Sequence, residues 1–177
     1  MAATTPESDS IESSGGLEGS QSIVGRVAFQ SFRDGNWEIY YGDDVFSSVR
    51  RLTTDGAADV EPALSRNSQR IAFTSKRTGN YDIFAMNTDG GGLVQLTGDP
   101  AVDSAPAWSP NGQRILFQSN RSGNVDVWVM NADGSGQTRL TNNADYDGEP
   151  TWSPDGTQIA FVSRRSGDTA AYNLYVM

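Results

Sequence analysis

The chain repeats itself every 44 residues. A phenylalanine recurs four times at that interval, and an arginine recurs four times four positions later. These residues are Phe29, Phe73, Phe117 and Phe161, followed by Arg33, Arg77, Arg121 and Arg165. A Leu-Thr pair, a proline and a serine also return in the same register. A period of this length limits the fold to stacked helix pairs or to four-stranded sheets packed side by side.

The fine pattern inside each unit predicts strands rather than helices. Residues 70–75 alternate between two faces, and residues 81–86 are short, β-branched and aromatic. The segments 109–112 and 153–156 place Pro second and Gly fourth, which suits a type I turn between two strands. Each full unit is therefore expected to form four antiparallel strands. In the third unit these are expected at 106–109, 114–119, 125–131 and 137–141.

Both faces of the predicted sheets are apolar. In residues 81–86, Ile83 and Ala85 point to one side while Phe84 and Met86 point to the other. Such a sheet must be covered on both sides. A radial array of packed sheets provides that cover, so the pattern predicts an all-β fold.

The repeat resembles that of TolB-type, WD-repeat-like β-propellers. The resemblance is carried by AWSPNG at 107–112, RILF at 114–117, SNRSGN at 119–124 and DVWVMNADG at 126–134. It covers residues 23–177 and implies β-propeller blades, about 3.5 four-stranded antiparallel blades per chain. The family commonly has six or seven blades. It often occurs in exported bacterial proteins that mediate protein contacts, and also in propeller domains attached to peptidases. The resemblance alone therefore favours an extracytoplasmic location, periplasmic or extracellular.

The repeat register divides the chain into an arm and a partial propeller. Residues 1–22 are rich in Ser, Thr, Gly and Glu, which predicts a flexible N-terminal arm. The propeller units are expected at 23–54, 61–97, 105–141 and 149–177. We expect the first unit to lack its innermost strand. The last unit is expected to lack its outermost strand, after a three-residue insertion around 169–171.

The end units carry the apolar pattern of the interior ones. Open stacks of repeats normally need polar outer faces at their ends. Here the end units contain Trp37, Ile39 and Tyr40, and Leu174, Tyr175 and Val176. We therefore expect completion by another chain or by missing sequence.

The pattern allows three ways in which the partial propeller could be completed. Two copies would supply 28 strands, enough for seven four-stranded blades if each partial blade finds its missing strand in the partner. Alternatively, residues 21–24 or the upstream tail add a strand to a neighbour and give rings or filaments. The third alternative is that the chain is a fragment of a longer propeller.

Repeated charged pairs predict structural ties rather than catalysis. The expected pairs are Arg33 with Glu38, Arg77 with Asp82, and Arg121 with Asp126. A catalytic site needs differentiated roles, whereas a pair copied into every unit is most simply a link between strands or blades. The last unit has Asn173 at the acidic position, so Arg165 is expected to lack its partner and to mark an intermolecular contact.

A second acidic series precedes each innermost strand. Asp59, Asp103 and Asp147 are expected around one mouth of the channel, where they could bind a cation or a basic peptide. The competing interpretation is capping of local backbone N–H groups. Residues 143–148 begin like a calcium loop, but Pro154 stands where the closing Glu belongs, so no metal site is predicted.

The aromatic repeat positions are interpreted as packing residues. Trp108 and Trp152 share one innermost-strand position, where an aromatic ring could stack on a sugar but more often fills the wedge between blades. The four repeated phenylalanines have the same interpretation.

Composition narrows the function. The chain has no His and no Cys, which removes the commonest acid–base catalyst, metal ligands and cysteine nucleophile. A net charge of −9 argues against nucleic acid as a partner, and no apolar run is long enough for membrane insertion. We therefore expect a non-enzymatic scaffold without cofactors. It is expected to bind itself or another protein, with a carbohydrate- or peptide-binding propeller or a hydrolase accessory domain as alternatives.

Overall fold

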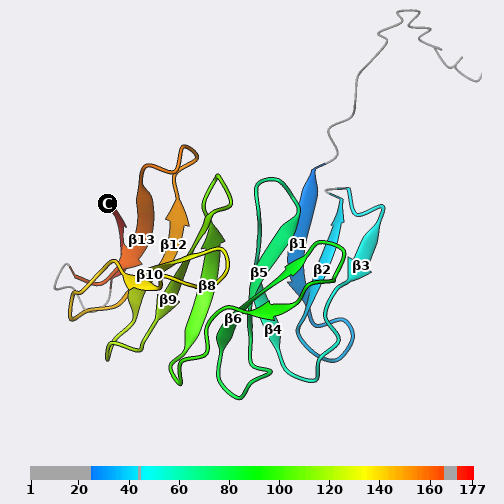
Figure 1. Cartoon of the computed structure of the whole chain (residues 1–177), viewed down its shortest axis with the longest axis horizontal. Coiled ribbons are helices and arrows are strands. Elements are labelled where there is room, and N and C mark those ends of the chain that lie inside the picture. Colours follow the sequence, from blue (N-terminus) through cyan, green and yellow to red (C-terminus); the bar gives the residue numbers. More distant parts are fainter. Residues whose placement is uncertain (1–24, 44, 166–170) are drawn as a thin grey trace, which may run out of the picture.

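Four antiparallel sheets follow one another along the chain (Figure 1). The computed structural model describes residues 25–43, 45–165 and 171–177. The first sheet contains β1 (Arg26–Ser31), β2 (Glu38–Asp43) and β3 (Val49–Arg51). The second contains β4 (Asp59–Leu64), β5 (Arg70–Ser75), β6 (Asp82–Asn87) and β7 (Val94–Gln95).

The third and fourth sheets repeat this plan. The third contains β8 (Asp103–Trp108), β9 (Arg114–Ser119), β10 (Asp126–Asn131) and β11 (Thr138–Arg139). The fourth contains β12 (Asp147–Trp152), β13 (Ile159–Ser163) and β14 (Asn173–Val176). In each sheet the spatial order of strands equals their sequence order. The predicted series of three, four, four and three strands is therefore confirmed for the described residues. The predicted arm at 1–22, the added strand at 21–24 and most of the insertion at 169–171 lie outside them.

The innermost strands begin earlier than the sequence predicts. β8 starts at Asp103 rather than at residue 106, and its pairing with β9 shifts register between Ser104 and Ala107. Ala105 has a φ of 52°, so the strand carries a β-bulge just before Pro106. The bulge absorbs one residue, and the strand extends to both sides of the proline.

The outermost strands are shorter than predicted because a threonine hydroxyl group, rather than a backbone carbonyl group, accepts the last hydrogen bond from the neighbouring strand. β11 ends at Arg139, whereas the expectation reached residue 141. The Val127 N–H donates to Thr141 Oγ1 at 3.0 Å instead of to a strand carbonyl. The recurring Leu-Thr pair therefore closes the first three sheets with a side-chain hydrogen bond.

Three apolar clusters join the four sheets. Phe73, Phe84 and Met86 pack with Ile39 between the first and second sheets. Ile83 and Ala85, on the opposite face of β6, pack against the third sheet. The two faces of this strand thus separate as predicted. A third cluster, with Leu116, Val127 and Phe161, joins the third sheet to the fourth. Together the sheets form a partial β-propeller.

Candidate interaction surfaces

The repeated arginines of the second, third and fourth sheets each bind an aspartate on the innermost strand of their own sheet. Arg77 Nη2 donates to both carboxylate oxygens of Asp59, at 2.9 and 2.8 Å. The equivalent bonds are Arg121 to Asp103 at 2.6 Å and Arg165 to Asp147 at 2.5 Å. The predicted partners of Arg77 and Arg121, Asp82 and Asp126, were therefore wrong, and so was the expectation that Arg165 is unpaired.

The guanidinium groups also lie over aromatic rings. Arg77 Cζ is 4.9 Å from the Phe84 ring centroid, and Arg165 Cζ is 4.8 Å from that of Tyr175. Arg33 stacks in the same way on Tyr40, at 4.5 Å. The position equivalent to Asp59 in the first unit is residue 15, a glycine, and it lies outside the described residues. Among the described residues, Glu38 pairs with Arg51 rather than with Arg33, so the predicted Arg33–Glu38 pair was wrong as well.

The aspartates predicted at the channel mouth are buried. Asp59, Asp103 and Asp147 have no solvent exposure, and each faces its arginine. A ligand at these carboxylates would have to displace a guanidinium group. The Oδ1 atoms of Asp103 and Asp147 have no partner among the described residues. The arrangement supports a structural tie better than it supports a ligand site.

A second buried acid joins the outermost strand to its neighbour. Asp126 accepts from Thr141 at 3.2 Å and pairs with Arg139 at 2.7 Å. In the second sheet Gln95 occupies the position of Arg139 and donates to Asp82 at 3.2 Å. Burial raises the pKa of Asp82, although hydrogen bonds from threonine hydroxyl groups oppose that rise. The recurrence of Thr after Leu was the sequence signal for this network.

The bulges of the innermost strands link successive sheets. Glu61, Ala105 and Glu149 all have φ near +50°, with values of 52°, 52° and 51°. Each exposed N–H finds an acceptor on the preceding sheet: Gln30 at 2.6 Å, Glu61 at 2.8 Å and Gln118 at 2.9 Å, respectively. Sequence reasoning missed this ladder, because an unstrained strand was assumed before each proline.

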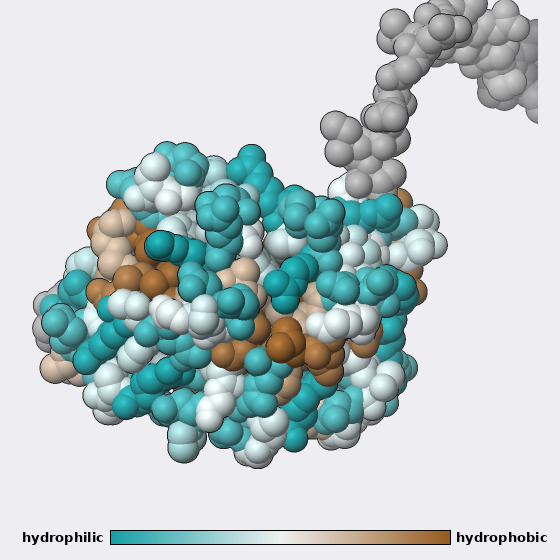
Figure 2. Space-filling model, in the orientation of Figure 1, coloured by the Kyte–Doolittle hydropathy of each residue, from teal (hydrophilic) through white to brown (hydrophobic). Residues whose placement is uncertain are grey.

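The outer face of the fourth sheet is apolar and exposed. Leu174 and Val176 are 73% and 57% exposed. Figure 2 shows apolar patches on an otherwise polar face, one of them on the side of the C-terminal sheet. This agrees with the sequence expectation for Leu174 and Val176. Tyr175 instead packs inward on the cluster between the third and fourth sheets, so its predicted availability was wrong.

The outer face of the first sheet is better covered than expected. Ile39 is buried against the second sheet, so its predicted availability was wrong. Tyr40 stacks on Phe29 at 5.6 Å, and Phe46 meets Phe29 edge-on at 5.6 Å. Of the three predicted residues, Trp37 alone is substantially exposed. The two ends of the stack therefore differ.

The two tryptophans of the innermost strands, at the ends of β8 and β12, lie between sheets. Trp108 is buried in the cluster that joins the second and third sheets. Trp152 is partly buried and packs against the cluster between the third and fourth. The Trp108 position leaves little of the ring free for a sugar.

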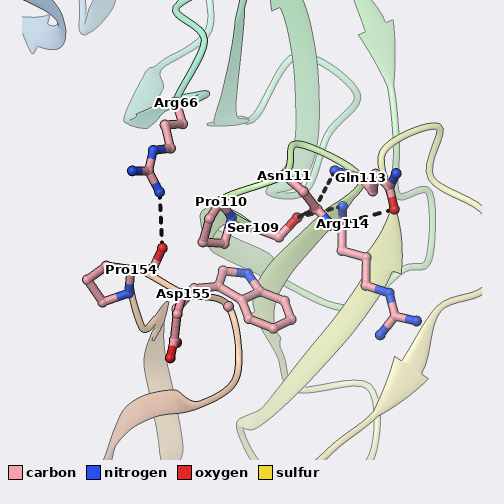
Figure 3. A pocket seen from close by; sticks show the side chains of 10 residues that line it. Arg66, Ser109, Pro110, Asn111, Gln113, Arg114, Pro154 and Asp155 are labelled. Carbon is pink, nitrogen blue, oxygen red and sulfur yellow. Dashed lines mark hydrogen bonds between the residues drawn. The ribbon is translucent and has the colours of Figure 1, made fainter.

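Turns from three sheets surround a cavity of about 470 Å³. Its lining includes Arg66, Arg114, Trp152 and Asp155. Arg66 Nη1 reaches across to the Pro154 carbonyl at 3.0 Å (Figure 3). Hydrogen bonds from Ser153 and Thr157 lower the pKa of Asp155 to about 2, so this carboxylate is ionised at neutral pH. The cavity thus combines both charge signs with an indole ring.

Other site types find no support in the described residues. Residues 25–43, 45–165 and 171–177 contain no cluster of three or more His, Cys, Asp or Glu side chains able to hold a metal ion. Within the same ranges, no helix has the length and apolarity needed to cross a membrane. In the weak calcium-like motif, the Asn143 and Asp145 carbonyls accept hydrogen bonds from Asn124, at 2.9 and 2.8 Å.

Comparison with known proteins identifies the repeat. A family model described as the TolB beta propeller domain matches residues 95–177. A search of curated proteins gives no match. Residues 95–177 therefore resemble TolB-type β-propeller repeats.

Solved structures extend the similarity to the whole described chain. The chain is similar to a putative TolB from Agrobacterium tumefaciens, with 26% identity and a TM-score of 0.76 over 86% of this chain and 57% of that one. TolB from Acinetobacter baumannii gives 25% identity and a TM-score of 0.75, over 86% and 38%. Hydrazine synthase from Kuenenia stuttgartiensis, 19% identical with a TM-score of 0.69, shares the fold over 88% of this chain and 30% of that one. The chain thus spans less than two thirds of either TolB chain.

Proposed function

We propose that this chain is a non-catalytic scaffold that associates with further propeller blades supplied by a second copy of itself. The observation that carries the proposal is the exposed outer face of the fourth sheet. There, Leu174 and Val176 occupy the repeat positions at which Ile83 and Ala85 pack against the next sheet. Because this exposed face carries apolar residues at the positions that face the next sheet elsewhere in the chain, we expect it to bind the matching face of another sheet.

The first sheet of a second copy offers such a surface. Inside the chain, the side of each sheet that receives its predecessor carries an aromatic pair, such as Phe73 with Phe84 in the second sheet. The first sheet has the equivalent pair, Phe29 with Tyr40. Packing the fourth sheet of one copy on the first sheet of another would continue the existing junctions. The described residues of each chain form four sheets, so a closed dimer by this route would have eight blades rather than the seven obtained by counting strands.

Repetition of the polar network supports a non-catalytic role. The Arg–Asp pairs occur once in each of three sheets with the same geometry, and each is largely buried. Catalysis requires a site whose groups have different roles. The chain also has no His and no Cys.

Light scattering on the purified chain tests the proposal. We expect a mass above that of the 19.0 kDa monomer, either as a closed dimer or as a larger polymer. Leu174→Asp should return the chain to a monomer, because it places a charge in the new junction. Val102→Asp is the matched control, since Val102 is also exposed but lies outside this face. A wild-type monomer at about 100 μM, a concentration that would populate micromolar association, would contradict self-association and favour cover by further blades of a longer polypeptide.

The turn cavity favours a second candidate function, binding of a peptide or carbohydrate. It brings unlike groups from three sheets together: Arg66, Arg114, Trp152 and Asp155. Screening glycan and peptide libraries against wild type and Arg114→Ala tests this. Hits that bind both proteins equally would exclude the cavity as their site.

An extracytoplasmic location is also proposed, on the likeness to TolB. Fractionation of cells that express the native reading frame tests it, and recovery of the protein only in the cytoplasm would contradict it.

A further inference from the structure

The junction between the second and third sheets contains a slot that a side-chain amide fills. Gln137 Oε1 accepts from Arg121 Nη1 at 2.6 Å. Its Nε2 donates to the carbonyl oxygens of Leu96 and Gly134, each at 3.1 Å. The three hydrogen bonds use both ends of the carboxamide, so the slot is complementary to that group.

The junction between the first and second sheets has the same wall but no amide. Leu93 occupies the position of Gln137, 44 residues earlier, and its side chain is 48% exposed. A cavity of about 280 Å³ remains, lined by residues equivalent to those around Gln137. The lining is Leu52, Thr53, Thr54, Asp55, Arg77, Met86, Gly90 and Leu93. A leucine cannot make the hydrogen bonds that the wall offers.

The arginine in this wall keeps a donor available. Within the described part of the chain, Arg77 donates through Nε to Ser75 and through Nη2 to Asp59. Arg121 makes the same two bonds and adds the Nη1 bond to Gln137. Arg77 is thus held in the orientation that presents Nη1 to the cavity.

The slot between the first and second sheets, which contains no amide, is also wider than the slot that Gln137 fills. A Cβ added to Gly134 would lie 2.7 Å from the Leu96 carbonyl oxygen, whereas one added to Gly90 would lie 3.9 Å from that of Leu52. The two carbonyl-bearing walls therefore stand farther apart in the first junction. A group from outside the chain has room to enter.

We propose that this slot binds a primary carboxamide, the group at the end of a glutamine side chain, supplied in trans. Its oxygen accepts from Arg77 Nη1 and its NH₂ group donates to the carbonyl oxygens of Leu52 and Gly90. A carboxylate fits poorly, because it has no donor for the two carbonyl groups. An ammonium group fits poorly because it has no acceptor for the Arg77 Nη1 donor. The proposal goes beyond the scaffold function and does not depend on self-association.

A titration with N-acetyl-glutamine N-methylamide, followed by ¹H–¹⁵N correlation spectra, tests the slot. We expect saturable shifts at residues 52–55, 77 and 90–93, with millimolar affinity because the ligand is small. The glutamate and leucine analogues serve as matched controls and should bind at least tenfold more weakly, because each lacks the amide donor. Repeating the titration on Leu174→Asp separates this result from the fate of the self-association proposal.

Two reciprocal substitutions sharpen the test. Leu93→Gln should fill the slot from within and weaken binding at least tenfold. Gln137→Leu should open the sister slot and add a second set of shifts at residues 96–98, 121 and 134–137. Propionamide distinguishes the source of the group: equal affinity indicates a free small amide, and weaker affinity indicates a peptide. Equal binding of the leucine analogue, or binding unchanged by Leu93→Gln, would overturn the proposal.

Discussion

The second and fourth sheets place the same repeat positions in opposite environments. Ile83 and Ala85 of β6 are fully buried, whereas Leu174 and Val176 of β14 are largely exposed. Both pairs have the same register against the preceding strand. Their partners on β5 and β13 are separated by 88 positions, which is two repeats. Exposure at these positions is therefore set by the presence of a neighbouring sheet and not by residue type.

The largest expected loss of stability is at the two tryptophans. Trp108→Ala should lower the free energy of unfolding by about 3–5 kcal/mol, because it removes a buried ring from the junction between the second and third sheets. Trp152→Ala, at the junction with the fourth sheet, should cost about 1–3 kcal/mol, since Trp152 is less buried. Urea denaturation of both variants measures the difference. Equal costs would mean that the two junctions are equally well packed.

A somewhat smaller loss of stability is expected on the faces of the sheets. Ile83→Ala should cost about 2–4 kcal/mol, because it leaves a cavity in a buried cluster. Leu174→Ala should change the stability of the isolated monomer by less than about 0.5 kcal/mol. Thermal unfolding at low protein concentration makes the measurement. If Leu174→Ala costs as much as Ile83→Ala, β14 is already covered.

The second sheet can be given the ion pair that the third sheet has. Gln95→Arg should stabilise the fold by about 1 kcal/mol at pH 7, because an arginine would meet the buried Asp82 as Arg139 meets Asp126. Arg139→Gln is the reciprocal control and should be destabilising.

The effect of Gln95→Arg should depend on pH. The folded-state pKa of Asp82 is raised by burial, so the folded wild type binds this proton more tightly than the unfolded chain does. Wild-type stability from this group is therefore fully present below the unfolded pKa and is lost as pH rises through the folded pKa. The advantage of Gln95→Arg should shrink as pH falls through that range. A pH-independent difference in unfolding free energy would contradict this account.

The smallest expected effect is at the two slots. Leu93→Gln should add about 0.5–1 kcal/mol if the new amide makes the three hydrogen bonds of Gln137. Gln137→Leu should remove a similar amount. Differential scanning calorimetry of the two variants and their combination tests whether the slots are interchangeable, and a loss of stability in Leu93→Gln would show that they are not.

Several of these features were accessible from the sequence. The 44-residue repeat predicted the number of sheets, and the alternation in residues 81–86 separated the two faces of β6 correctly. Both follow from local geometry, because alternate residues of a strand point to opposite sides. The composition likewise excludes histidine and cysteine chemistry.

The partner of each arginine is determined by the tertiary structure. Asp59 and Asp82 both lie opposite Ser75, one on each neighbouring strand. Sequence spacing alone is therefore compatible with either aspartate as the partner of Arg77. Thr97 and Gln95, at the outer edge of the second sheet, donate hydrogen bonds to Asp82, whereas Arg77 donates to Asp59. Competition among hydrogen-bond partners depends on which strands meet, which the repeat alone does not specify.

What the sequence by itself determined is therefore the sheet: its strands, its faces and the positions that must be covered. What only the tertiary structure decided is the content of the junctions: the bulge at Ala105, the slot that Gln137 fills and Leu93 leaves open, and the exposure of Leu174. The physical reason is that strand periodicity acts over a few residues, whereas hydrogen-bond satisfaction and burial depend on groups brought together from different sheets.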